Sequence, residues 1–202
     1  MSEIFQPRDP DKFEAALCQF DQENSRDPNV ENGQPRELLY AQRLTDWVLK
    51  LRPDASEELR LAARCQHICR WEIPRGSRPQ TRAGYLKWRA DLKKFHAQKA
   101  GEILKAGGYD DEIVRRVQEL NLKKHFPNDT ESRVLEDALC LVFLQFQFTD
   151  LAAKSEDDKM INALRKSWQK MTDAARADER RFPQQGDFDL DGAFAWRDNG
   201  WR

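Results

Sequence analysis

The densest concentration of residues able to do chemistry lies between Arg64 and Arg89. This segment carries seven Lys or Arg residues against one acid, Glu72, and it interleaves these charges with aromatic side chains. Guanidinium groups bind phosphate or carboxylate through paired hydrogen bonds, and an indole beside them can stack on a flat ring. The pattern therefore predicts an anion pocket on a loop between two helices. We expect the anionic group of a ligand to be bound by Arg70, Arg75, Arg82 and Arg89, and a flat ring of the ligand to stack on Trp71 or Trp88.

The same composition also has a purely structural interpretation. These arginines could pair with acids elsewhere in the chain and stack on the tryptophans, which would stabilise the fold without any ligand. The sequence leaves the two interpretations open.

Two histidines and one carboxylate are candidates for proton or metal chemistry. His67 falls on one face of a predicted helix, and His96 falls on the apolar face of another, because residues three and four apart are neighbours on a helix. Asp137 precedes a run of apolar residues, where an unpaired carboxylate would be costly to bury. For each histidine taken alone, a structural role is the alternative to a functional one.

The four cysteines form no C-x-x-C pair, and their neighbours are apolar. Cys65 and Cys69 are one helical turn apart and could hold a metal with two further ligands. Buried, reduced thiols are the favoured interpretation.

Helices must position these side chains, since apolar residues recur at three- and four-residue spacing in every long segment. The third predicted helix is capped by Asp54, with Glu57 three residues later, and runs through His67 to Trp71. The segment 132–154 is the most apolar and is predicted to be a central buried helix. The predicted helices cover residues 12–23, 35–51, 54–71, 84–106, 110–122, 132–154 and 155–177.

The predicted fold is therefore all-α, with about seven helices in one compact domain over residues 1–178 and a C-terminal tail over 179–202. A chain of 202 residues is long enough to bury a core. The formal net charge of -1 argues against a general attraction to nucleic acid or to an anionic membrane. No apolar run approaches the length of a membrane span, and the first residues lack a secretory layout, so we expect a cytoplasmic protein. The oligomeric state is left open.

Several stretches resemble a family known as domain of unknown function 4202, which consists of helical proteins of about this length. The stretches are DPN at 27–29, ELLYAQRLTDW at 37–47, QHICRWEIPR at 66–75, GYLKWR at 84–89, LEDALCLVFL at 135–144 and LRKSWQKM at 164–171. This resemblance implies a helical fold and little about function.

A more distant resemblance is to the HD-domain phosphohydrolases, whose helices hold a divalent metal through histidines and aspartates. YAQRL is similar to the helix of the first histidine, with Tyr40 in its place, and AARCQHICR is similar to the His-Asp helix, with Gln66 and His67 at those positions. His96 matches an extra histidine of some members, and Asp137 matches the last ligand. The resemblance implies an HD-like fold in which His67, His96 and Asp137 line one cavity, with Glu136 in reserve and Lys123 and Lys124 at the rim.

Two functions from different classes are candidates. The first is hydrolysis at phosphorus of a nucleotide or another phosphorylated small molecule, with His67, His96 and Asp137 as catalytic residues. These three residues would bind a divalent metal, or Asp137 would pair with His67 or an arginine in a metal-free site whose imidazole is a general base. The second is a catalytically inactive helical scaffold that binds a nucleotide, RNA or a protein partner. Nucleic acid is the least favoured of these, because no RNA-binding module is recognisable.

Overall fold

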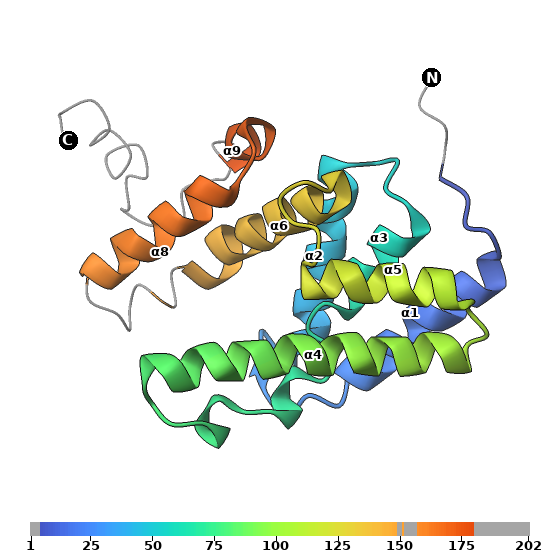
Figure 1. Cartoon of the computed structure of the whole chain (residues 1–202), viewed down its shortest axis with the longest axis horizontal. Coiled ribbons are helices and arrows are strands. Elements are labelled where there is room, and N and C mark those ends of the chain that lie inside the picture. The colour runs from blue at the N-terminus through green and yellow to red at the C-terminus, as the bar shows by residue number, and fades with distance from the viewer. Residues whose placement is uncertain (1–4, 149–150, 152–156, 180–202) are drawn as a thin grey trace. The chain divides into compact units, whose positions relative to one another are not determined.

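The computed structural model describes residues 5–148, 151 and 157–179. The chain divides into two units, Met1–Leu139 and Cys140–Arg202. Within the described residues the regular structure is helical apart from one short hairpin, so the all-α prediction is confirmed (Figure 1). None of the described helices is long and apolar enough to cross a membrane.

The first unit is built from long helices joined by short connections. They are α1 (Pro10–Asn24), α2 (Arg36–Leu51), α3 (Glu57–Cys65), α4 (Arg82–Ala106), α5 (Asp111–Leu122) and the start of α6 (Thr130–Val142). The hairpin β1 (Val30–Glu31) and β2 (Gln34–Pro35) precedes α2, and the 3-10 turns η1 (Arg70–Glu72) and η2 (Arg75–Ser77) precede α4. Helix α3 packs against α1, α2 and α5, and α4 packs along α5 (Figure 1).

Most of these helices begin at a side-chain cap. Asp9, Ser56, Thr81 and Asp110 each accept a hydrogen bond from a backbone N–H in the first turn that follows. Such a cap satisfies one of the donors that have no partner within the helix. Asp110 accepts from two N–H groups, those of Glu112 and Ile113.

The core of the first unit lies where these helices meet. Its largest fully buried side chains are Phe20, Leu44, Leu59, Leu61, Ile68, Leu104, Leu120 and Leu135. Helices α4 and α5 approach closely at Gly101, where an added Cβ would stand 2.3 Å from Nε2 of Gln118. That amide nitrogen donates instead to the carbonyl of Ala97 at 2.9 Å, so glycine at this position admits a bond between the two helices.

The second unit has its own small core. It contains the π-helical turn η3 (Phe143–Gln147), α8 (Asp157–Lys170) and α9 (Asp173–Glu179). Phe148, Met160 and Leu164 are buried together, with Phe143 and Leu144 packed against them. The Arg176 guanidinium donates to the carbonyl of Trp168 at 2.9 and 3.1 Å, which ties α9 to the end of α8.

The predicted course of the third helix was wrong at both ends. Helix α3 is capped by Ser56, whose hydroxyl accepts from the N–H of Leu59 at 3.1 Å, and not by Asp54. It ends at Cys65, before His67, and the N–H groups of Gln66 and Ile68 then donate to carbonyls three residues earlier, in tighter turns. Cys69 adopts a left-handed φ of 52° and donates its N–H to Oδ1 of Asn24 at 3.1 Å, so a contact with α1 holds the end of this turn.

Two further segments differ from the prediction: the loop before α2 and the most apolar helix. The predicted loop before α2 contains the hairpin, whose turn uses Asn32 and Gly33 at positive φ. The segment predicted as one helix over 132–154 is α-helical from Thr130 to Val142 and then π-helical, and residues 149–150 and 152–156 lie outside the described part. The predicted tail, 179–202, also lies outside it except for its first residue, so the domain boundary at 178 stays a prediction.

Candidate functional site

The first turn of α2 carries a buried carboxylate, Glu37. Pro35 precedes this helix and offers no side-chain cap, so Asp27 supplies one from the preceding loop. Oδ2 of Asp27 accepts from the N–H of Glu37 at 3.0 Å, while its Oδ1 accepts from the N–H of Asn29. Tyr40 follows Glu37 by three residues and therefore lies on the same face of α2. Both side chains are buried.

His67 lies against this pair, just beyond the end of α3. Its ring stacks on Tyr40 with centroids 4.2 Å apart and an interplanar angle of 12°. Its Nδ1 is 3.4 Å from Oε2 of Glu37. Oε2 nevertheless has no hydrogen-bond partner, so this is a close electrostatic contact rather than a formed hydrogen bond. The His67 side chain retains 24% of its exposure, whereas that of Glu37 retains 7%, so a ligand can reach the imidazole more easily than the carboxylate.

His96, in the middle of α4, adds a second imidazole. The two rings have centroids 5.7 Å apart. Nδ1 of His96 donates to the carbonyl of Ile68 at 2.8 Å. Because a carbonyl oxygen can only accept, Nδ1 of the neutral ring carries the proton. Nε2 of His96 is buried and has no hydrogen-bond partner. Helices α2 and α4 and the turn after α3 thus place Glu37, His67 and His96 in one cluster.

Positive charges surround this cluster. Nε of Arg70 is 3.6 Å from Oε1 of Glu37. Lys123, which directly follows α5 in a left-handed backbone conformation, forms an ion pair with Glu136 of α6. The charges of Arg70, Lys123 and Arg89 all act on the imidazole of His67. The cluster therefore combines a covered carboxylate with a partly open imidazole in a positive field.

Burial dominates the proton chemistry of these groups. It raises the pKa of Glu37 to about 7, against an opposing effect of Arg70. Burial first, and then Arg70, Lys123 and Arg89, hold the pKa of His67 well below its usual range. Burial and the neighbouring His67 lower the pKa of His96 to about 3. Both imidazoles are therefore neutral at pH 7, and the carboxyl group of Glu37 is about half protonated at that pH.

A layer of guanidinium groups and aromatic rings extends from the cluster along the start of α4. We call this layer the cationic aromatic face; it consists of Arg70, Arg75, Tyr85, Trp88 and Arg89. The guanidinium carbon of Arg70 is 4.9 Å from the centre of the Trp88 ring, and that of Arg75 is 5.9 Å from it. The centre of the Tyr85 ring is 5.8 Å from the guanidinium carbon of Arg75 and 5.8 Å from that of Arg89. Arg70 contacts both Glu37 and Trp88, so this face is continuous with the buried cluster.

The predicted anion-binding residues divide into several groups. Arg70 and Arg89 lie near His67, whereas both terminal nitrogens of Arg75 donate at 3.0 Å to the carbonyls of Arg78 and Pro79 and so hold the loop before α4. Trp88 is buried, and its Nε1 donates to the carbonyl of Ile73 at 2.9 Å.

The other two predicted ligand residues occupy the edges of this region. Arg82 is exposed in the first turn of α4, and Trp71 is half-buried in η1. Tyr85, which is 41% exposed, is the more accessible aromatic ring of the cationic aromatic face.

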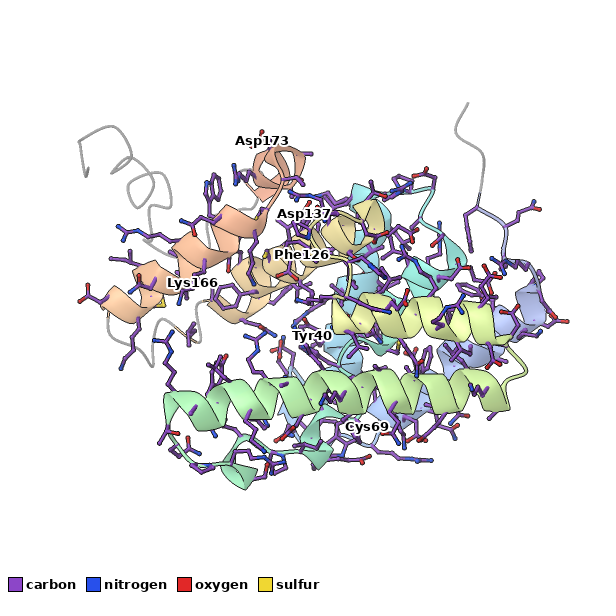
Figure 2. All side chains as sticks on the ribbon, in the orientation of Figure 1. Tyr40, Cys69, Phe126, Asp137, Lys166 and Asp173 are labelled. Carbon is purple, nitrogen blue, oxygen red and sulfur yellow. The ribbon has the colours of Figure 1, made fainter. Side chains whose placement is uncertain are left out.

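Of the predicted trio of His67, His96 and Asp137, the two histidines lie side by side, with ring centroids 5.7 Å apart. Asp137 is buried on α6, where Figure 2 labels it, and its place in the site stays a prediction. Among the described residues, no three His, Cys, Asp or Glu side chains are grouped so that they could hold a metal ion. The donor set does not fit the divalent metal that the HD resemblance implies, and we derive no step through a metal.

Sequence reasoning missed Glu37. The available signal was its position on α2, three residues before Tyr40 and seven before Leu44, both of which belong to the apolar face of that helix. An acid on the apolar face of an amphipathic helix is unusual and points to a buried partner or a function.

The fold and the cluster together define an all-α protein with a buried carboxylate–histidine site open on a cationic face. Residues 14–187 match the model of a family described as domain of unknown function (DUF4202), and the chain belongs to this family. The predicted membership is thereby confirmed, while the HD-like arrangement stays a prediction. No curated protein and no solved structure matched the chain.

Proposed function

We propose that this protein binds a phosphorylated small molecule and hydrolyses its phosphate ester, with His67 as the general base. The observation that carries the proposal is the position of this partly exposed imidazole, 3.4 Å from a buried glutamate and within the field of three cationic side chains. Negative charge is attracted to such a site, and the adjacent imidazole can accept a proton.

A bound phosphate would also adjust the imidazole to its task. Part of the downward shift in the pKa of His67 comes from Arg70, Lys123 and Arg89. A phosphate dianion placed among these charges would offset them and raise the pKa of His67 toward neutrality. The ligand itself would therefore make the base more effective.

In the proposed reaction a water molecule attacks phosphorus while the ester P–O bond breaks. The water proton passes to Nε2 of His67, since Nδ1 faces Glu37, and then to the leaving oxygen, so that an alcohol and inorganic phosphate are released. Glu37 would stabilise the transient imidazolium, in the way that a buried carboxylate supports a catalytic histidine. Arg70 and Arg89 would neutralise the phosphoryl oxygens.

Binding and chemistry can be tested separately. We expect inorganic phosphate to raise the melting temperature of the protein, because a ligand of the native state stabilises it. We expect phosphate release from p-nitrophenyl phosphate to be lost in His67→Gln and kept in His125→Gln, a matched change at an exposed histidine. Phosphate binding without hydrolysis in the parent protein would replace the enzyme with the scaffold alternative. Absence of both would exclude this site as a phosphate site.

A further inference from the structure

The cluster contains two buried atoms, one on His96 and one on Glu37, that have no hydrogen-bond partner and that both act as acceptors once Glu37 is ionised. Nδ1 of His96 donates to Ile68, so Nε2 carries a lone pair, and this atom has no hydrogen-bond partner. Oε2 of Glu37 likewise has no hydrogen-bond partner. His96 is 3% exposed and Glu37 is 6% exposed, so bulk water does not compensate for the missing donors.

These two acceptors belong to one site. The ring of His96 lies beside that of His67, and Nδ1 of His67 approaches Oε2 of Glu37. The charges of Glu37 and Arg70 both act on His96, which places the imidazole among the groups of the cluster. A ligand held at His67 would therefore have both acceptors close to it.

The chemistry of these two acceptors restricts which ligand group could satisfy them. His96 is neutral at physiological pH, and a neutral imidazole whose other nitrogen is already a donor can only accept. A second anionic group would be repelled by Glu37, and a methyl group would leave both acceptors unsatisfied. A hydroxyl or amino group supplies the donors that they lack.

We propose that Glu37 and His96 form a recognition subsite for a hydroxyl or amino group that the phosphorylated ligand carries near its phosphate. This inference rests on the proposed function, because it takes the phosphate to lie at His67. It narrows the substrate class to phosphate monoesters of alcohols that bear a further hydroxyl or amino group. His96 is thus a specificity-determining residue, since a site built to accept a donor discriminates against an analogue without one.

The test compares three probes by calorimetry on the full chain: propyl phosphate, glycerol 3-phosphate and 2-aminoethyl phosphate. We expect the last two to bind the parent protein about tenfold or more tightly than propyl phosphate, as expected for satisfying a buried acceptor. In His96→Phe, which keeps a ring but removes both nitrogens, the ratio of these affinities should fall to about one. Because this ratio compares probes within one variant, a general loss of affinity for phosphate would lower all three affinities without changing the ratio.

The outcomes separate this inference from the proposed function. Equal affinity of the parent protein for all three probes would overturn the subsite and leave the phosphate site standing. Failure of every probe and of inorganic phosphate to bind would overturn the phosphate site itself. If His96→Phe does not fold, the same ratio is measured in His96→Leu. A preference that persists in a folded variant lacking both nitrogens would show that His96 does not read the donor.

Discussion

Nδ1 of His67 lies 3.4 Å from Oε2 of Glu37, although the two residues come from different elements of the fold. The same helix, α2, supplies both this carboxylate and the Tyr40 ring on which the imidazole stacks. One rigid element thus sets the position of His67 from two sides. This contact is electrostatic and is not a hydrogen bond. A ligand that shifts the imidazole would change the distance between the two atoms.

The buried carboxylate should give the protein a distinctive pH dependence. Glu37 has a pKa of about 7 in the folded chain and an ordinary value of 4.5, so the folded state retains a proton between these pH values that the unfolded chain has lost. Its contribution to the free energy of unfolding therefore falls as pH rises through this window, by about 3 kcal/mol in all. His96, with its lowered pKa, acts in the opposite sense, because its contribution is lost as pH falls from 6.5 toward 3.

We therefore expect Glu37→Gln to gain stability relative to the parent protein as pH rises from 4.5 to 7.5, by about 3 kcal/mol. Urea denaturation at four pH values across this range measures the difference. A gap between the two proteins that does not change with pH would contradict a raised pKa for Glu37. Asp46→Asn, at an exposed acid on the same helix, provides the control for the loss of a carboxylate.

Asn24 should be important for both stability and the site. Its Oδ1 accepts the N–H of Cys69, and this contact fixes the left-handed residue that follows His67 and Ile68. Asn24→Ala would leave a buried N–H unpaired, and we expect the free energy of unfolding to fall by about 1–3 kcal/mol. Denaturant titration checks this, with the exposed Asn128→Ala as the control. Equal stability of the two variants would show that the turn is held by other contacts.

Arg75 and Arg89 should separate loop stability from ligand binding. Because the terminal nitrogens of Arg75 donate to Arg78 and Pro79, we expect Arg75→Ala to lower the free energy of unfolding by about 1–2 kcal/mol. Arg89 is exposed, and its charge acts on His67, so Arg89→Ala should weaken phosphate binding with little loss of stability. Thermal unfolding with and without phosphate measures both effects. The reverse pattern would place the anion at Arg75.

Asp137 tests the role of the buried start of α6. Its side chain is buried in the first unit, so its charge must be compensated, and we expect Asp137→Asn to lower the free energy of unfolding by about 1–3 kcal/mol. The proposal for Glu37 and His67 further predicts that the folded variant still binds phosphate. Loss of binding at unchanged stability would show that Asp137 belongs to the site, as the sequence predicts.

Local sequence was sufficient for much of this protein. Apolar spacing predicted an all-α chain with a helix over 110–122, where α5 lies, and the quoted stretches predicted the family that the match over residues 14–187 confirmed. These features are readable because helix periodicity, capping and family motifs depend on residues close together in the chain. The burial of His96 followed from the same periodicity.

The tertiary structure alone decided the composition of the site. The left-handed residue Cys69, in the turn after α3, is held by Asn24, which lies on α1 and reaches its N–H across the fold. Glu37 became the partner of His67 because α2 packs against α3, and no spacing within the chain encodes that approach. Whether an arginine faces a ligand or its own loop likewise depends on which acceptors the folded backbone brings near, as Arg75 shows. Patterns in sequence report which faces are buried, but which polar groups meet there is determined by the packing of whole helices against one another.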